Sequence, residues 1–223
     1  MRASRGERRS WETSLKIECS VFGPLANNVY LLVDEITGNA AIIDPGIDSE
    51  PALDHIRESG WNLRCVINTH GHIDHAYCDA FFMKETGASL FIHEQDVPIL
   101  EHMAEQAEWL GVKPPEQPVP NCILKGAESI HLGSILLLVL HTPGHSPGGI
   151  CLVGDGIVFS GDTLSACSIG RTDLPGGDYK ALMKSIGELL LPLPDHMVVC
   201  PGHGPQTTIG DEKTKNPFLV GIG

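Results

Sequence analysis

Residues 69–75, with the sequence Thr-His-Gly-His-Ile-Asp-His, constrain the fold of this chain more than any other segment. His70, His72, Asp74 and His75 are four potential metal ligands within six residues, and they directly follow an apolar segment that we predict to be a buried strand. Because alternate residues of an extended chain point the same way, His70 and His72 can share one metal ion. Asp74 and His75, where the chain turns into a predicted helix, can reach the same ion or a second one. The alternative is a polar turn with solvated imidazoles, but packing alone has no use for three histidines there.

A similar pattern, in which an apolar strand ends in a glycine-containing turn with a histidine or an aspartate, occurs elsewhere in the chain. Glycine lets the backbone turn sharply and lets other groups approach closely. In a layered α/β fold the ends of such strands meet at one edge, where binding sites form. We therefore expect one site that joins the 70–75 segment to the residues that this pattern adds, which are His145, Asp162 and His203.

Asp44, in Ile42-Ile43-Asp44-Pro45-Gly46, has the same context and allows two interpretations. Its carboxylate can orient a ligand histidine or a metal-bound water. Alternatively, the side chain holds its own turn through a local hydrogen bond.

Apolar runs alternate with turn signals along the chain, which predicts an α/β (α+β) sandwich with sheets inside and helices outside. We expect strands at 28–33, 40–43, 64–68, 89–93, 134–140, 149–153, 157–160 and 197–200. We expect helical segments at 51–59, 76–86, 94–110 and 178–190. Four prolines between 114 and 120 predict an extended surface loop. The expected organisation is a single domain over residues 15–223 after a flexible N-terminal tail, residues 1–14.

Composition argues against several classes of function. Fifteen Lys and Arg against 28 Asp and Glu give a formal net charge of −13, which disfavours nucleic acid as the main partner. The longest aliphatic run, Ile135–Leu140, is far shorter than the roughly 20 residues that span a membrane. The arginines of residues 1–14 are followed by no apolar segment, so we expect no secretory signal, and acidic residues there disfavour a transit peptide. Seven cysteines, an odd number without a Cys-x-x-Cys pair, favour reduced thiols and a cytoplasmic location.

The ordered motifs His70-x-His72-x-Asp74-His75, His145, Asp162 and His203 resemble those of the metallo-β-lactamase superfamily, and Asp44 matches its first short motif. The segments 168–173, 201–205 and 216–218 are similar to those of short, bacterial glyoxalase II-like (hydroxyacylglutathione hydrolase-like) hydrolases. The resemblance implies a four-layer αββα sandwich with a dinuclear site. It also implies the ligand sets: His70, His72 and His145 for one ion, Asp74, His75 and His203 for the other, and Asp162 as the bridge.

The resemblance also implies an activity, which is the hydrolysis of a small acyl thioester such as S-lactoylglutathione. Enzymes of the β-lactam-cleaving branch often carry a cysteine at a metal position where this chain has aspartate, which favours the glyoxalase-like branch. Full-length glyoxalase II adds a C-terminal helical domain that helps to hold glutathione. Only about twenty residues follow His203 here, so the carrier thiol stays open.

The chemistry of these side chains is consistent with hydrolysis. Five histidines and two aspartates suit Zn(II), which we expect, with Fe(II) or Mn(II) as alternatives. Two such ions about 3.5–4 Å apart can lower the pKa of a shared water to about 7, and the resulting hydroxide can attack a thioester carbonyl. The thiolate leaving group, whose conjugate acid has a pKa of about 8.5, departs without a strong general acid. Asp74 can orient the nucleophile, and Asp162 holds both ions in place.

Some assignments stay open at the level of sequence. Arg171, in a Gly-Arg-Thr-Asp loop, can bind a substrate carboxylate or form a structural ion pair with Asp173 or Asp178. A mononuclear-iron persulfide dioxygenase, with the iron held by His70, His145 and Asp162, is the alternative activity. A non-catalytic metal-binding protein is the second alternative. The oligomeric state is not predicted.

Overall fold

The computed structural model describes residues 15–220, which form two six-stranded sheets and a small hairpin. The tail expected at residues 1–14 lies outside the described residues. The first sheet has the order β1-β2-β3-β4-β5-β6, in which β3 to β6 are mutually parallel and β1, β2 and β3 pair antiparallel. Its strands are β1 (Leu15–Phe22), β2 (Asn27–Asp34), β3 (Asn39–Ile43), β4 (Asn62–Ile67), β5 (Ser89–His93) and β6 (Cys122–Leu124).

The second sheet has the order β14-β13-β10-β9-β8-β7, and its pairs are antiparallel except for the parallel pair of β10 and β13. Its strands are β7 (Ser129–Leu132), β8 (Ile135–His141), β9 (Ile150–Gly154), β10 (Ile157–Gly161), β13 (Val198–Pro201) and β14 (Thr207–Thr208). The hairpin is formed by β11 (Leu164–Ser165) and β12 (Ser168–Ile169).

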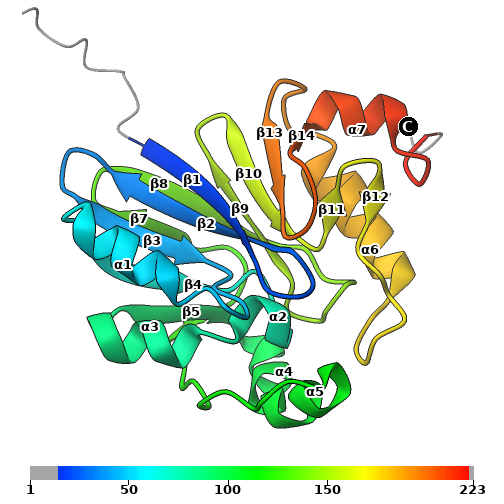
Figure 1. The fold of residues 1–223 in the computed structure, drawn as a ribbon. Helices are drawn as coiled ribbons and strands as arrows, with labels where there is room; N and C mark the ends of the chain where they lie inside the picture. Colours follow the sequence, from blue (N-terminus) through cyan, green and yellow to red (C-terminus); the bar gives the residue numbers. More distant parts are fainter. Residues whose placement is uncertain (1–14, 221–223) are drawn as a thin grey trace, which may run out of the picture.

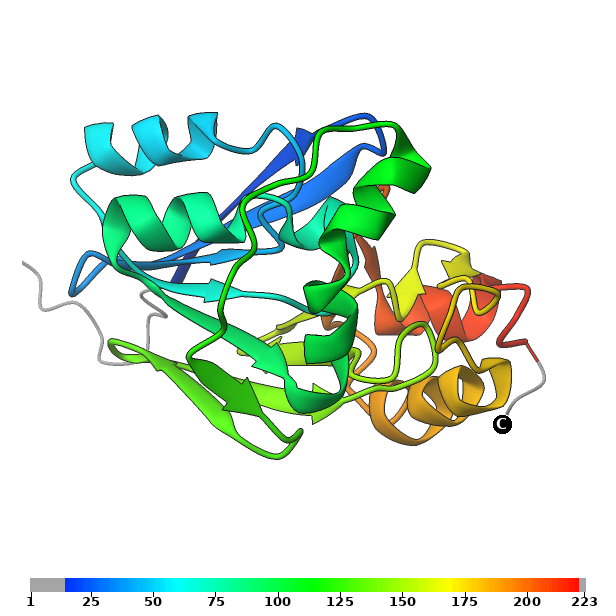
Figure 2. The same cartoon turned by 90° about the horizontal axis from the view of Figure 1, so that it is seen from below.

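Helices cover the outer faces of both sheets (Figures 1 and 2). The first sheet carries α1 (Pro51–Glu58), α2 (Ile73–Ala76), α3 (Asp79–Thr86), α4 (Val97–Glu101) and α5 (Met103–Leu110). The second sheet carries α6 (Tyr179–Ser185), which continues as a π-helical turn at Ile186–Leu190, and α7 (Ile209–Lys215). The order helix, sheet, sheet, helix is the predicted four-layer αββα sandwich in a single domain.

Alternation along the strands explains the three cores between these four layers. In β2, the side chains of Tyr30 and Leu32 pack between the two sheets, whereas Leu31 and Val33 pack under the helices of the first sheet. Successive side chains of a strand point to opposite faces, so a strand that is apolar throughout supplies two cores at once. A third core lies between the second sheet and α6.

Several predicted elements are divided or extended in the structure. The helix expected at 76–86 begins earlier, as α2, and is interrupted before α3 because the backbone N–H of Cys78 donates to the carbonyl of Pro45 instead of continuing the helix. The segment expected to be helical at 94–110 is a 3₁₀ turn at Glu94–Asp96 followed by α4 and α5, which are separated at His102. The sequence pattern did not predict β1, β6, β7, β11, β12, β14 or α7.

Two further expectations, which concern the proline segment and the cysteines, agree with the structure. The segment that contains the four prolines of 114–120 is extended, and all seven cysteines are free thiols. None of the helices within residues 15–220 is long and apolar enough to cross a membrane.

The strands that position the site all end at one edge of the sandwich. In the first sheet β3, β4 and β5 are parallel, so their C-terminal ends lie together. In the second sheet β8, β10 and β13 run in one direction, because β9 is antiparallel to both β8 and β10. The loops after these six strands therefore meet between the two sheets.

Candidate metal centre

The structure brings all seven predicted ligands together at this edge. His70 and His72 lie in the loop after β4, and Asp74 and His75 lie in α2, which follows it. The loops after β8, β10 and β13 contribute the other three, which are His145, Asp162 and His203. Their nitrogen and oxygen atoms form three overlapping groups in which all atoms lie within 4.8 Å of one another.

One cluster consists of three imidazoles. His145 Nε2 lies 3.0 Å from Nδ1 of His72 and 3.3 Å from Nε2 of His70. The second cluster combines two imidazoles and a carboxylate. His203 Nε2 lies 3.1 Å from Nε2 of His75 and 3.2 Å from Oδ2 of Asp74.

Asp162 lies between the two clusters. Its Oδ1 is 3.5 Å from Nε2 of His75, and its Oδ2 is 3.6 Å from Nε2 of His145. Oδ2 also lies 3.8 Å from Nε2 of His203, which belongs to the second cluster. The carboxylate is therefore within reach of both clusters, as a bridging ligand must be.

The distances between these atoms fit divalent ions at both clusters. Ligand atoms about 2.0–2.1 Å from a tetrahedral zinc ion lie roughly 3.3–3.4 Å apart. The separations of 3.0–3.6 Å within and between the clusters are close to that value. Imidazole nitrogens this close repel each other through their lone pairs, and a shared cation removes that repulsion.

Hydrogen bonds on the far side of the rings fix which nitrogen faces the clusters. Nδ1 of His145 donates to the backbone carbonyl of Arg171 over 2.8 Å, and Nδ1 of His203 donates to the carbonyl of Leu25 over 3.0 Å. Because a carbonyl only accepts, Nδ1 carries the hydrogen in both rings, and Nε2 presents its lone pair to the site.

Thr69 and Asp44 form the hydrogen bonds that orient the rings of His70 and His75. The Thr69 hydroxyl donates to Asp44 Oδ2 over 2.7 Å, so its oxygen accepts from Nδ1 of His70 over 3.0 Å. Asp44 also accepts from the Thr69 backbone N–H over 2.7 Å and from Nδ1 of His75 over 3.2 Å. The Asp44 carboxylate is buried and bonds residues 25 and 31 positions away, not its own turn. This placement favours the ligand-orienting interpretation of Asp44.

Asp96 is a buried residue that the sequence pattern did not single out. Its carboxylate accepts hydrogen bonds from the backbone N–H of Gly71 over 2.8 Å, the hydroxyl of Ser146 over 2.7 Å and the backbone N–H of Gly148 over 2.5 Å. Gly71 separates His70 from His72, and Ser146 follows His145. Asp96 thus ties together two ligand loops that come from different sheets. A usable signal was its position after the apolar strand at 89–93, the same context as the predicted ligands.

Burial and neighbouring charges make the two clusters electrostatically different. Burial and the neighbouring histidines lower the pKa of His72 to about 4, and they hold the pKa of His70 well below its usual range. These imidazoles are therefore neutral at physiological pH, the form that binds metals. Burial opposes a charge on His75, but the carboxylates of Asp74 and Asp162 raise its pKa to about 10. The second cluster therefore attracts positive charge, which a divalent ion also supplies.

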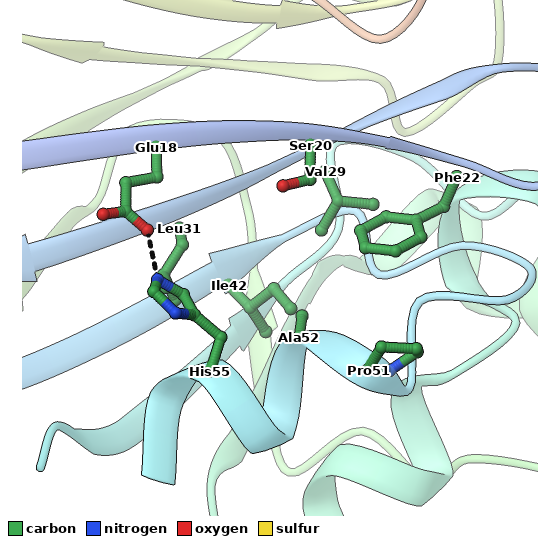
Figure 3. Close-up of a pocket in the computed structure, with 9 residues that line it drawn as sticks. All are labelled: Glu18, Ser20, Phe22, Val29, Leu31, Ile42, Pro51, Ala52 and His55. Atoms are coloured by element: carbon green, nitrogen blue, oxygen red, sulfur yellow. Dashed lines mark hydrogen bonds and ion pairs between the residues drawn. The ribbon is translucent and has the colours of Figure 1, made fainter. Parts of the chain in front are cut away.

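A cleft of about 890 Å³ opens directly onto the site. Five of the seven predicted ligands line it, which are His72, Asp74, His145, Asp162 and His203. A second cavity, of about 200 Å³, lies between α1 and the first two strands (Figure 3). It contains no predicted ligand, and the carboxylate of Glu18 accepts a hydrogen bond from His55 there.

Arg171 lies at the edge of the large cleft. Its guanidinium makes two 2.8 Å hydrogen bonds to the carboxylate of Asp173, and both side chains are exposed. The structure therefore contains the ion pair that the sequence left as one alternative. The other partner considered, Asp178, instead caps the N-terminus of α6 by accepting from the N–H groups of Lys180 and Ala181.

Comparisons with known proteins agree with this geometry. The family profile of the metallo-β-lactamase superfamily matches residues 22–203. The hydroxyacylglutathione hydrolase GloC of Haemophilus influenzae is 39% identical over 185 residues, which cover 81% of this chain and 87% of that protein. The structure of the BLEG-1 B3 metallo-β-lactamase superposes with a TM-score of 0.86 at 34% identity, covering 92% of this chain and all of that one. The structure of TTHA1623 in a di-iron-bound form superposes with a TM-score of 0.80 at 36% identity, covering 91% and 100%. The chain therefore belongs to the metallo-β-lactamase superfamily.

Proposed function

We propose that this protein is a glyoxalase II-like hydrolase that cleaves thioesters with the help of two divalent metal ions. The observation that carries the proposal is the pair of ligand clusters with Asp162 between them, at the floor of a cleft large enough for a small-molecule substrate. The similarity to a hydroxyacylglutathione hydrolase supports the choice of a thioester.

The ligand assignment follows the two clusters. His70, His72 and His145 would hold one ion, whereas Asp74, His75 and His203 would hold the other, with Asp162 in contact with both. Zinc is our first choice, and iron or manganese suits the same nitrogen and oxygen donors. The di-iron form of the related TTHA1623 supports testing iron as well. When bound, such ions supply a nucleophile at neutral pH and polarise the carbonyl oxygen.

The residues of the chain position the reactants. Asp74 and Asp162 both line the cleft, so their carboxylates can accept hydrogen bonds from the attacking water and orient it. The water oxygen bonds to the acyl carbon, the C–S bond breaks, and sulfur leaves with the bonding electron pair as a thiolate. The products are a carboxylic acid, which ionises, and a thiol. Because the thiolate is weakly basic, it can leave without a strong general acid.

Metal analysis coupled to a hydrolysis assay tests the proposal. The protein is purified with zinc, iron or manganese in the medium, metal content is measured per chain, and thiol release is followed with S-lactoylglutathione and other thioesters. We expect two ions per chain and hydrolysis that Asp162→Ala abolishes. Asp155→Ala is the matched control, because Asp155 is exposed in the turn between β9 and β10.

Two outcomes would contradict the proposal. One iron per chain, oxygen uptake with glutathione persulfide and no thioester cleavage would identify a persulfide dioxygenase instead. Metal-loaded protein without turnover on thioesters, lactones or β-lactams would identify a non-catalytic metal-binding protein.

A further inference from the structure

The cleft above the ligand clusters is apolar over most of its lining. Five apolar side chains come from α2, α4 and α5, which border one side of the cleft: Ile73, Pro98, Ile99, Trp109 and Leu110. Four more come from loops that also contribute to the site: Leu25, Pro147, Leu174 and Pro175. These residues line the same cleft as five of the predicted metal ligands, so a molecule bound against them also reaches the metal-binding side chains.

Three of these apolar side chains are unusually exposed for their type. Trp109 is 68% exposed, Leu25 46% and Leu110 39%. Large apolar groups that rim a cleft beside a reactive site are typical of a surface that is covered when substrate binds.

The cleft has little to attract a negatively charged ligand beyond the metal ions themselves. Among the described residues that line it, Arg171 is the only lysine or arginine. Its guanidinium is already bonded through two nitrogens to Asp173. Glu105 adds a carboxylate to the lining. His102 also lines the cleft and is exposed, and its Nδ1 is hydrogen-bonded to the carbonyl of Pro98. A substrate recognised through several carboxylates would therefore meet no lysine or arginine that is free to bind it among these residues.

We propose that the acyl group of the substrate is apolar and longer than a lactoyl group, and that it packs against the wall formed by Ile99, Trp109 and Leu110. This inference rests on the proposed thioesterase function and specifies its substrate class. A cleft of about 890 Å³ is near the upper end of ordinary ligand sites, which leaves room for such a chain beside the carbonyl.

An acyl-length series on one neutral carrier tests the inference. N-acetylcysteamine thioesters of acetate, lactate, butyrate and hexanoate keep the leaving group constant. Each methylene that moves from water to an apolar wall raises kcat/KM by up to about fourfold, so hexanoyl should exceed acetyl by about tenfold or more. Lactoyl should remain close to acetyl, because its hydroxyl gains nothing from an apolar wall.

Substitutions locate the effect on the wall. Trp109→Ala should lower the hexanoyl-to-acetyl ratio of kcat/KM at least about threefold. Leu110→Ala and Leu136→Ala form a matched pair, because both leucines are partly exposed, at 39% and 45%, but Leu136 lies in β8, away from the cleft. We expect the ratio to fall with Leu110→Ala and to stay unchanged with Leu136→Ala. The thioether N-acetyl-S-hexylcysteamine, which cannot be hydrolysed, should bind more tightly than its S-ethyl analogue by calorimetry, and Trp109→Ala should remove the difference.

The outcomes separate the two proposals. Thioester cleavage that does not depend on acyl length, or that favours lactoyl over hexanoyl, would overturn this inference and leave the proposed function intact. The same conclusion would follow if both leucine variants changed the ratio equally. Absence of cleavage of every thioester by protein with two bound ions would overturn the proposed function, and the inference with it.

Discussion

Replacement of Asp96 by asparagine tests whether its buried carboxylate keeps the ligand loops of the two sheets in their relative positions. In the structure, Oδ2 accepts from Gly71 and Ser146, and Oδ1 accepts from Gly148. Asparagine keeps one acceptor oxygen and presents an NH₂ group in place of the other. In either orientation of the amide, one backbone N–H of a ligand loop faces another donor.

The magnitude follows from these contacts. A buried donor without a partner costs about 1–3 kcal/mol, and hydrogen bonds to charged groups are worth about 1.5–3 kcal/mol. We therefore expect the free energy of unfolding to fall by about 2–4 kcal/mol, which corresponds to a decrease in Tm of roughly 5–15 °C for a chain of this size. Groups that orient metal ligands typically affect metal affinity by about 10–100-fold, and we expect zinc to bind more weakly by a similar factor.

A second buried aspartate supplies the control for this prediction. Asp79 and Asp96 are both fully buried. Asp79, however, accepts a single 3.2 Å hydrogen bond from the side chain of Asn68, and its Oδ2 has no hydrogen-bond partner among the described residues. Asp79→Asn should therefore cause no loss of stability and no loss of zinc affinity. Thermal unfolding of the metal-free protein and zinc titration compare the two variants. Equal effects of Asp96→Asn and Asp79→Asn on both measurements would refute the positioning role of Asp96.

Three further predictions follow from other features. Gly202→Ala should weaken zinc binding by tenfold or more, because a Cβ at that position collides with Asp162 and His75. Gly187→Ala is the control, because a Cβ there meets open space and should not change zinc affinity. A normal zinc affinity of Gly202→Ala would contradict this geometry. Burial raises the pKa of Asp79 well above its usual range, so the stability contributed by its proton is lost as pH rises from about 4 through the folded-state pKa. Urea unfolding of the metal-free protein should therefore show Asp79→Asn gaining stability relative to wild type with increasing pH, and a constant difference would argue against a neutral Asp79. Burial raises the pKa of four thiols to about 11 or 12, so these thiols stay protonated and unreactive at pH 8. Iodoacetamide at pH 8, followed by mass spectrometry, should therefore label the exposed Cys19 and Cys167 in the folded protein. The four buried thiols are those of Cys65, Cys78, Cys151 and Cys200, and their labelling at the rate of the exposed thiols would contradict their burial.

The strand-end pattern predicted much of the fold and of the site because local sequence and local structure agree there. An apolar run that ends in a glycine turn with a histidine shows the strand, its end and the side chain at once, as at His145 and His203. The strand β1 lacks such a pattern, because Lys16 and Glu18 interrupt its apolar residues and several of its side chains are exposed.

Asp96 shows why the rest could not be predicted. It follows a strand, as the predicted ligands do, but no glycine stands between the strand and Asp96, and the histidine at the strand end, His93, belongs to none of the ligand groups. Its hydrogen-bond partners Gly71 and Gly148 lie 25 and 52 residues away, on loops from different sheets. Such a role depends on how the two sheets pack together, and no local sequence pattern records that packing.

The carbonyl groups that orient His145 and His203 belong to Arg171 and Leu25, whose side chains line the cleft. Each of these residues thus has two separate roles: its backbone carbonyl sets the tautomer of a histidine in the site, and its side chain lines the cleft. Every amino acid, proline included, offers the same carbonyl as long as the loop keeps its conformation. Substitution at these two positions can therefore change the lining of the cleft while the two histidines keep their orientation. A change in loop length, in contrast, would alter both properties together.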